Sequence, residues 1–295
     1  MFEKMKTSWA LTKQSWAVLR EQKSLVVFPL ISGALTILVV CTFLLPPIGY
    51  FAMSAGGYLD ESGGSDPAKI ELWQRALMWL AMFLCYFLAS VVVTFFNAAL
   101  VACAMQHFAG EVTSPRRGLD IALSRWKQII AWSLVNATVG VVLQFLKENV
   151  GWLGRLVLGA TGVAWTIATF FVVPVLVVEG VGPIEAVKRS TDVLKKTWGE
   201  SLIMQFGVGT VMGLFGFVVF LVCTGAGVAI AVAMQSPIPG FVGAGLGILG
   251  AILIGLVSSV LKTILVAACY QYASQGRVPA EFDGGILRQV VGVKR

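Results

Sequence analysis

The side chains most able to do chemistry are the polar residues that interrupt long apolar segments. A charge in hydrocarbon is costly, so an ionisable residue there is a candidate site. Lys262 lies inside the last apolar run, and Glu179, at the end of an earlier run, is a candidate partner. Asn97, Asn136 and Gln144 add amides within other runs. These five residues predict either a substrate or ion site, or structural pairing, snorkelling and interhelical hydrogen bonds.

The chain offers little material for catalysis. Its single histidine, His107, follows Gln106 near the end of an apolar run, and its five cysteines all lie in apolar segments without a CxxC spacing. The sequence contains no HExxH, GxSxG or phosphate-binding GK[ST] motif. Hydrolysis or group transfer needs a base together with a nucleophile or metal in one pocket. We therefore expect no enzyme, no cofactor and no metal site.

Two segments combine basic residues with tryptophan in the manner of membrane-surface helices. Trp9 and Trp16 are seven residues apart, two helical turns along one face. The second segment, residues 183–199, carries Lys188, Arg189, Lys195, Lys196 and Trp198. A basic helix with tryptophan on its apolar side can lie in the headgroup layer. We expect cytoplasmic amphipathic helices that either pack on their own bundle or contact lipid or a protein partner.

The composition identifies the solvent of the elements that position these residues. The chain is 57% hydrophobic and 13% charged, with a mean hydropathy of +0.85, whereas soluble domains carry about 25% charged residues. No Lys, Arg, Asp or Glu lies between Leu202 and Val260. The net charge of +7 fits anionic lipid headgroups, and no basic run is dense enough to predict nucleic-acid binding. The sequence therefore predicts an all-α integral membrane protein.

Six transmembrane helices are expected, with both termini in the cytoplasm. The predicted spans cover residues 25–50, 72–97, 128–147, 156–178, 202–234 and 241–268, and the second and sixth patterns continue toward Phe108 and Ser274. Seventeen Lys and Arg lie in the N-terminal segment, the loops after the second and fourth spans, and the C-terminal tail. The opposite loops hold four. This bias places the first face inside.

A repeat becomes visible when the charged segments are aligned. The segment from Lys13 to Arg20 matches that from Lys188 to Lys195 at four identical positions, and both precede a Ser-Leu pair that opens an apolar run. We expect one membrane domain, residues 1–295, built from units 2–116, 117–182 and 183–276 and a tail, 277–295. Each unit is a cytoplasmic amphipathic helix followed by a transmembrane hairpin. All enter from one side, so the repeats are parallel.

The last two spans are rich in glycine at helix-packing intervals. Gly209 and Gly213, and likewise Gly243 and Gly247, are separated by three residues. Such spacing lets helix backbones approach closely. It indicates packing within the monomer, contacts in a homo-oligomer, or hinges for gating.

Three segments carry a resemblance to known membrane proteins: Ser15 to Arg20 leading on to Gly33, Pro174 to Glu179, and Ala186 through Ser190 to Trp198. The chain resembles an uncharacterised family of six-helix prokaryotic membrane proteins, a domain of unknown function. It is similar to the YciC-like proteins and to the membrane domain attached to some glycerophosphodiester phosphodiesterases. The resemblance implies a plasma (inner) membrane location. It brings no catalysis, because the phosphodiesterase domain is absent here, and no functional residues.

We therefore expect a non-enzymatic multi-pass plasma-membrane protein that organises the membrane, handles lipid or supports a protein partner. Membrane lipids are the expected contacts. The alternative is a transporter or channel whose path runs between the repeats and is lined by Asn97, Asn136, Gln144 and Lys262. Soluble polar substrates normally require more polar groups inside the membrane than this chain offers.

Overall fold

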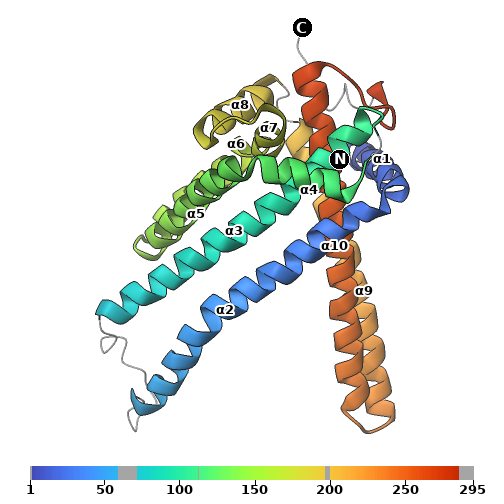
Figure 1. The fold of residues 1–295 in the computed structure, drawn as a ribbon. Helices are drawn as coiled ribbons and strands as arrows, with labels where there is room; N and C mark the ends of the chain where they lie inside the picture. The colour runs from blue at the N-terminus through green and yellow to red at the C-terminus, as the bar shows by residue number, and fades with distance from the viewer. Residues whose placement is uncertain (1, 59–71, 112, 197–199, 286–295) are drawn as a thin grey trace.

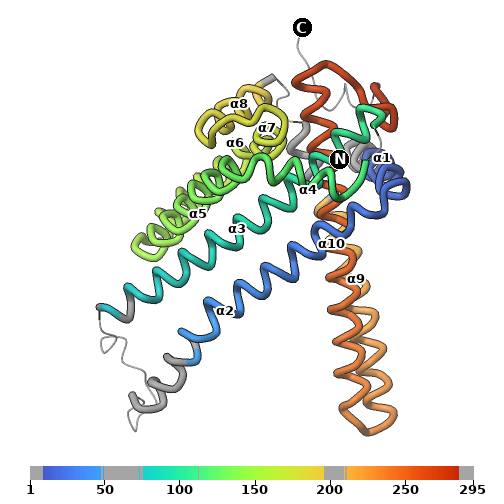
Figure 2. Tube along the Cα trace, viewed as in Figure 1, coloured from blue at the N-terminus to red at the C-terminus, as the bar shows by residue number. Residues whose placement is uncertain are grey.

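A computed structural model describes residues 2–58, 72–111, 113–196 and 200–285, and every regular element in these ranges is helical (Figures 1 and 2). In chain order the helices are α1 (Phe2–Glu21), η1 (Lys23–Val26), α2 (Val27–Tyr58), α3 (Leu72–Phe108), α4 (Pro115–Ser124), α5 (Trp126–Glu148), α6 (Trp152–Ala168), α7 (Val172–Glu179), α8 (Pro183–Lys196), α9 (Glu200–Ala233) and α10 (Ile238–Gln275).

Six helical stretches among the described residues are long and apolar enough to cross a bilayer. They are Lys23–Pro47, Ala76–Phe108, Trp126–Glu148, Trp152–Glu179, Val211–Ala233 and Ile238–Gln275. The shortest has 23 residues, against the roughly 20 needed to span the hydrocarbon core. The prediction of a six-span helical membrane protein is confirmed at this level.

The long helices diverge from a common end of the molecule. In Figure 1, the α2–α3 and α9–α10 pairs spread apart, and α5 runs beside α3 on the side away from α2. The short helices α4, α7 and α8 gather with α1 and the last turns of α10 at the common end. The turn between α9 and α10 lies at the opposite end.

The buried core lies at this common end, whereas the long arms expose apolar side chains. Residues 98–104 of α3 and 264–271 of α10 are buried, as are Leu11 and Val18 of α1. Farther along α9 and α10, Phe217 is 56% exposed and Leu253 is 52% exposed. Continuous exposed apolar surface is unfavourable in water. When hydrocarbon surrounds these long helices, their apolar side chains no longer face water. Helices can enter hydrocarbon because they satisfy their own backbone polar groups.

The short helices α4 and α8 begin with matching local chemistry. Each has proline in its first turn, Pro115 or Pro183, where the missing N–H costs nothing. The Ser114 hydroxyl also caps α4 by accepting a hydrogen bond from the Arg117 amide at 3.3 Å. A Cβ added to buried Gly118 would lie 2.7 Å from the Ala99 carbonyl oxygen. Glycine therefore lets α4 lie directly on α3.

The predicted fourth span, residues 156–178, is not one continuous helix. α6 ends at Ala168 and α7 begins at Val172. Pro174 explains the break, because it has no N–H for the residue 170 carbonyl and its ring clashes with that carbonyl in a regular helix. Phe171 in the break is buried, and its amide donates a hydrogen bond to the Ser190 hydroxyl of α8 at 3.0 Å. α8 therefore satisfies a backbone group that the break leaves free.

The two predicted glycine pairs have different roles. A Cβ on Gly243 would lie 2.6 Å from the Cys223 carbonyl oxygen and 2.7 Å from the Gly227 Cα, so these glycines bring the α9 and α10 backbones together. A Cβ on Gly213 would meet nothing within 4 Å. A Cβ on Gly247 would lie 3.1 Å from the Phe220 carbonyl oxygen. The prediction of a close backbone contact is therefore correct for Gly243 and Gly247 and wrong for Gly213, which does not face the partner helix.

Candidate functional site

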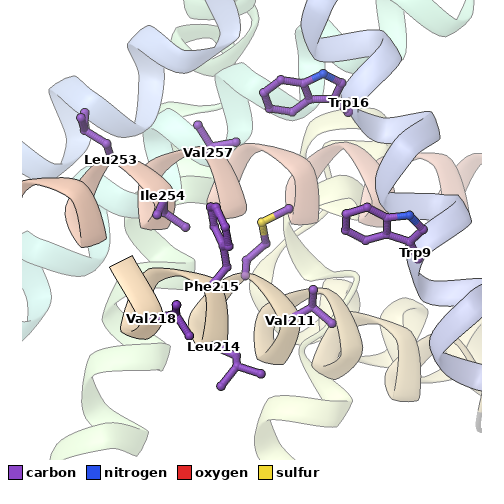
Figure 3. Close-up of a pocket in the computed structure, with 10 residues that line it drawn as sticks. Trp9, Trp16, Val211, Leu214, Phe215, Val218, Leu253, Ile254 and Val257 are labelled. Atoms are coloured by element: carbon purple, nitrogen blue, oxygen red, sulfur yellow. The ribbon is translucent and has the colours of Figure 1, made fainter. Parts of the chain in front are cut away.

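An apolar groove lies where α1 crosses the α9–α10 pair. Its volume is about 700 Å³. Figure 3 shows the groove between the three helices. The lining residues are Trp9 and Trp16 of α1, Val211, Met212, Leu214, Phe215 and Val218 of α9, and Leu253, Ile254 and Val257 of α10.

Helix α1 presents its two tryptophans to one end of this groove. They are two turns apart, about 10 Å along the axis at 1.5 Å per residue. Leu11, Ser15 and Val18 are buried and fix the other side of α1 against the bundle. Trp9 and Trp16 remain 51% and 49% exposed, and both indoles point from α1 toward α9 and α10 in Figure 3.

The groove walls contain hydrocarbon almost exclusively. Phe215 and Val218 come from α9, and Ile254 and Val257 face them from α10 (Figure 3). The indole N–H groups are the only side-chain hydrogen-bonding groups among the lining residues. Sites for polar ligands need several converging polar groups. The walls of this groove therefore suit an alkyl chain and provide no means of binding a polar solute.

Lys262 is not among the lining residues and lies in the contact between α9 and α10. A Cβ on Gly209 would lie 2.7 Å from the Lys262 Nζ, so the absent side chain leaves room for the ammonium group. No described carboxylate lies within ion-pairing distance of Lys262. Gly209 therefore makes room for the Lys262 ammonium group, whereas its spacing from Gly213 predicted a close approach of two helix backbones.

Glu179 binds other residues instead of its predicted partner Lys262. The Tyr270 hydroxyl donates a hydrogen bond to Glu179 Oε1 at 2.8 Å, and Arg189 Nε lies 3.5 Å from Oε2. Arg189 also lies 3.3 Å from Glu185, one turn earlier in α8. The Glu179–Lys262 pairing suggested by the sequence is therefore wrong. The carboxylate instead links the end of α7 to α8 and α10.

The three amide candidates do not gather in one place. The Asn136 amide donates to the Ser90 hydroxyl at 3.3 Å and accepts from the Trp165 indole at 3.4 Å, which joins α5 to α3 and α6. Gln144 donates within its own helix to Glu148 at 3.2 Å. Asn97 is half-buried on α3 beside the buried core segment. Interhelical hydrogen bonding is thus observed for Asn136 and not for Gln144.

The basic residues predicted on the second amphipathic segment lie on α8. Lys188, Arg189 and Lys195 are exposed, and Lys195 Nζ lies 4.0 Å from Asp192. Lys196 is the last residue of the helix. Trp198 lies outside the described residues.

A polar cluster at the common end was not predicted from the sequence. His107 Nε2 lies 3.2 Å from Glu281 Oε1 and 3.6 Å from Glu21 Oε2. The three donor atoms lie within 4.8 Å of one another, a set open to a divalent cation as well as to the ion pairs of a protonated imidazole. The cluster ties the end of α1 and the segment after α10 to the end of α3.

The six apolar helices define the class, a multi-pass α-helical membrane protein. Residues 76–280, more than half of the 295-residue chain, match the model described as Family of unknown function (DUF6159), and the chain belongs to that family. The comparison with curated proteins finds no match. Membership of an uncharacterised family is thereby confirmed, while the likeness to YciC-like proteins and the phosphodiesterase membrane domain stays a prediction.

Proposed function

We propose that this protein is a non-enzymatic plasma-membrane protein that handles lipid by holding an acyl chain between α1, α9 and α10. The observation that carries the proposal is the apolar groove of about 700 Å³ with Trp9 and Trp16 at one end. Tryptophan favours the boundary between headgroups and hydrocarbon. The pair therefore puts the α1 end of the groove at the membrane surface and its far end in the bilayer.

The topology in this proposal is three parallel hairpins, each preceded by an amphipathic helix on the cytoplasmic face, with both termini inside. The bias of Lys and Arg toward the common end supports it. Burial at aligned positions supports the repeat, because one face of α1 is buried at the same register as one face of α8. These buried residues are Ser15, Val18 and Leu19 in α1, and Ser190, Val193 and Leu194 in α8.

Packing, rather than the hydrophobic effect, holds the lipid in this proposal. The surrounding bilayer is as apolar as the groove, so moving a chain from one to the other gains little from leaving water. The gain comes from contact with fixed walls such as Phe215 and Ile254, and from groups at the interface. A groove that distinguishes lipids must therefore do so by shape and by the headgroup end.

Blocking the groove tests the proposal. Val257→Trp places a large ring among the lining residues, whereas Leu249→Trp adds the same ring at a 54% exposed site on α10 outside them. Each protein is purified in mild detergent, and retained phospholipid is quantified by mass spectrometry. We expect the parent and Leu249→Trp to retain lipid and Val257→Trp to lose most of it. Equal retention by all three would contradict the proposal.

The transport alternative would need its polar residues along one path. Asn136 joins α3, α5 and α6, Gln144 is exposed on α5, and Lys262 lies between α9 and α10. This separation favours lipid handling. A protein partner or a second copy of the chain would bind on the exposed arms, and cross-linking in membranes would detect either.

A further inference from the structure

We propose that the lipid held in the groove is an anionic phospholipid whose phosphate is bound by Lys13 and Arg20 of α1. This inference rests on the proposed function and assigns the headgroup that the groove selects. Four residues of α1 form the surface that we call the α1 stripe: Trp9, Lys13, Trp16 and Arg20.

The α1 stripe follows from helical spacing. Its members are four, seven and eleven residues from Trp9, and these intervals return to the same helix face. All four side chains are exposed. Lys13 and Arg20 are seven residues apart, about 10 Å along the axis at 1.5 Å per residue. Aromatic and cationic groups therefore alternate along a single face that includes the mouth of the groove.

The groove and the α1 stripe follow one another in space as the acyl chain, glycerol and phosphate do in a phospholipid. The lining runs away from α1 along α9 from Val211 to Val218, and along α10 from Val257 to Leu253 (Figure 3). A chain that follows this path has its glycerol end beside α1. The tryptophans then flank the glycerol region, and the cations of the stripe are placed to meet the phosphate.

Neither Lys13 nor Arg20 pairs with an acidic side chain in the part of the chain that the structure describes. The adjacent Glu21 is directed to His107. No Asp or Glu lies from Ser201 to Gln275, which covers all of α10 and all of α9 except its first residue, Glu200. The complementary charge is therefore left to a ligand.

Two cations at the membrane surface supply a measurable preference. Each basic residue near an anionic membrane surface contributes about 1 kcal/mol, which corresponds to roughly fivefold in affinity for one charge and roughly thirtyfold for two. Lipids with the same acyl chains make the same contacts with the groove walls, so the headgroup charge decides between them. We expect phosphatidylglycerol to be retained over phosphatidylcholine by about that factor.

The test compares two pairs of charge-removing substitutions in the full chain. Lys13→Gln with Arg20→Gln removes the cations of the α1 stripe. Lys188→Gln with Lys195→Gln removes the aligned charges of α8, where Ile184 and Thr191 replace the two tryptophans. Each protein is equilibrated in detergent with equal dioleoyl phosphatidylglycerol and dioleoyl phosphatidylcholine, purified, and analysed for both lipids by mass spectrometry.

We expect the α1 pair to retain total lipid but lose the phosphatidylglycerol preference, and the α8 pair to keep it. Lys13→Arg with Arg20→Lys should also keep it, which shows that charge is needed. An unchanged preference in the α1 pair would overturn the headgroup assignment while leaving the groove intact. Absence of retained lipid in the parent protein would instead overturn the proposed function.

Discussion

Replacing Gly243 with alanine should separate α9 from α10. The new Cβ would lie 2.6 Å from the Cys223 carbonyl oxygen and 2.7 Å from the Gly227 Cα, whereas carbon atoms in contact normally lie about 3.5–4.0 Å apart. The helices must therefore move apart by about 1 Å at this point. Because the opposing atoms are backbone atoms, no side chain can rotate away to relieve the clash.

The expected loss follows from two opposing terms. Overpacking costs about 1–3 kcal/mol, and alanine recovers about 1 kcal/mol of helix propensity relative to glycine. The free energy of unfolding should therefore fall by as much as about 2 kcal/mol. Gly245→Ala is the matched control, because a Cβ there meets nothing within 4 Å. That control should gain about 0.5–1 kcal/mol.

Unfolding by sodium dodecyl sulfate in mixed micelles, followed by circular dichroism, measures both variants. The glycine contact predicts changes of opposite sign at positions only two residues apart. Equal changes in the two variants would refute it, because general effects of alanine in an apolar helix act on both sites alike.

Three further outcomes are expected from the common end and the topology. Gly180→Ala should lower thermal stability in detergent by about 1–3 kcal/mol, because its φ is +65° and the new Cβ would overlap the Arg125 guanidinium; unchanged stability would exclude that geometry. His107→Gln should make the segment after α10 more sensitive to limited proteolysis, since the contacts of His107 Nε2 with Glu21 and Glu281 disappear; an unaltered cleavage rate would show that these contacts do not hold the segment. In intact cells, an impermeant thiol reagent should label Ser236→Cys and should label Lys188→Cys only after permeabilisation, and the reverse pattern would invert the topology.

The membrane helices could be predicted because their signal is local and large. Charge-free runs identify six spans by length alone, and the expected extensions to Phe108 and Ser274 agree with α3 ending at Phe108 and α10 ending at Gln275. The break at residues 169–171 was missed, although Pro174 was a visible signal. Hydropathy averages over a window, and a short break whose Phe171 amide is satisfied by Ser190 leaves the average unchanged.

The candidate site was predictable only in part. Their seven-residue spacing predicted that Trp9 and Trp16 share one face of a helix, and both line the groove. The groove walls could not be found this way, because α9 and α10 are apolar on every side and their sequences do not distinguish a lining face from a lipid-facing one. Glu21, His107 and Glu281 are far apart in the chain, so only the packing of α1 and α10 on α3 brings them together.

Photolabelling inside the bilayer tests the lipid-binding groove most directly. A phospholipid with a photoreactive group in its acyl chain is incorporated into vesicles with the parent protein, and cross-linked peptides are mapped after illumination. We predict strong labelling within residues 211–218 and 253–257, well above that of the equally apolar, largely exposed residues 37–40 of α2, which lie outside the groove lining. Equal labelling of these segments would show that no chain is held in the groove.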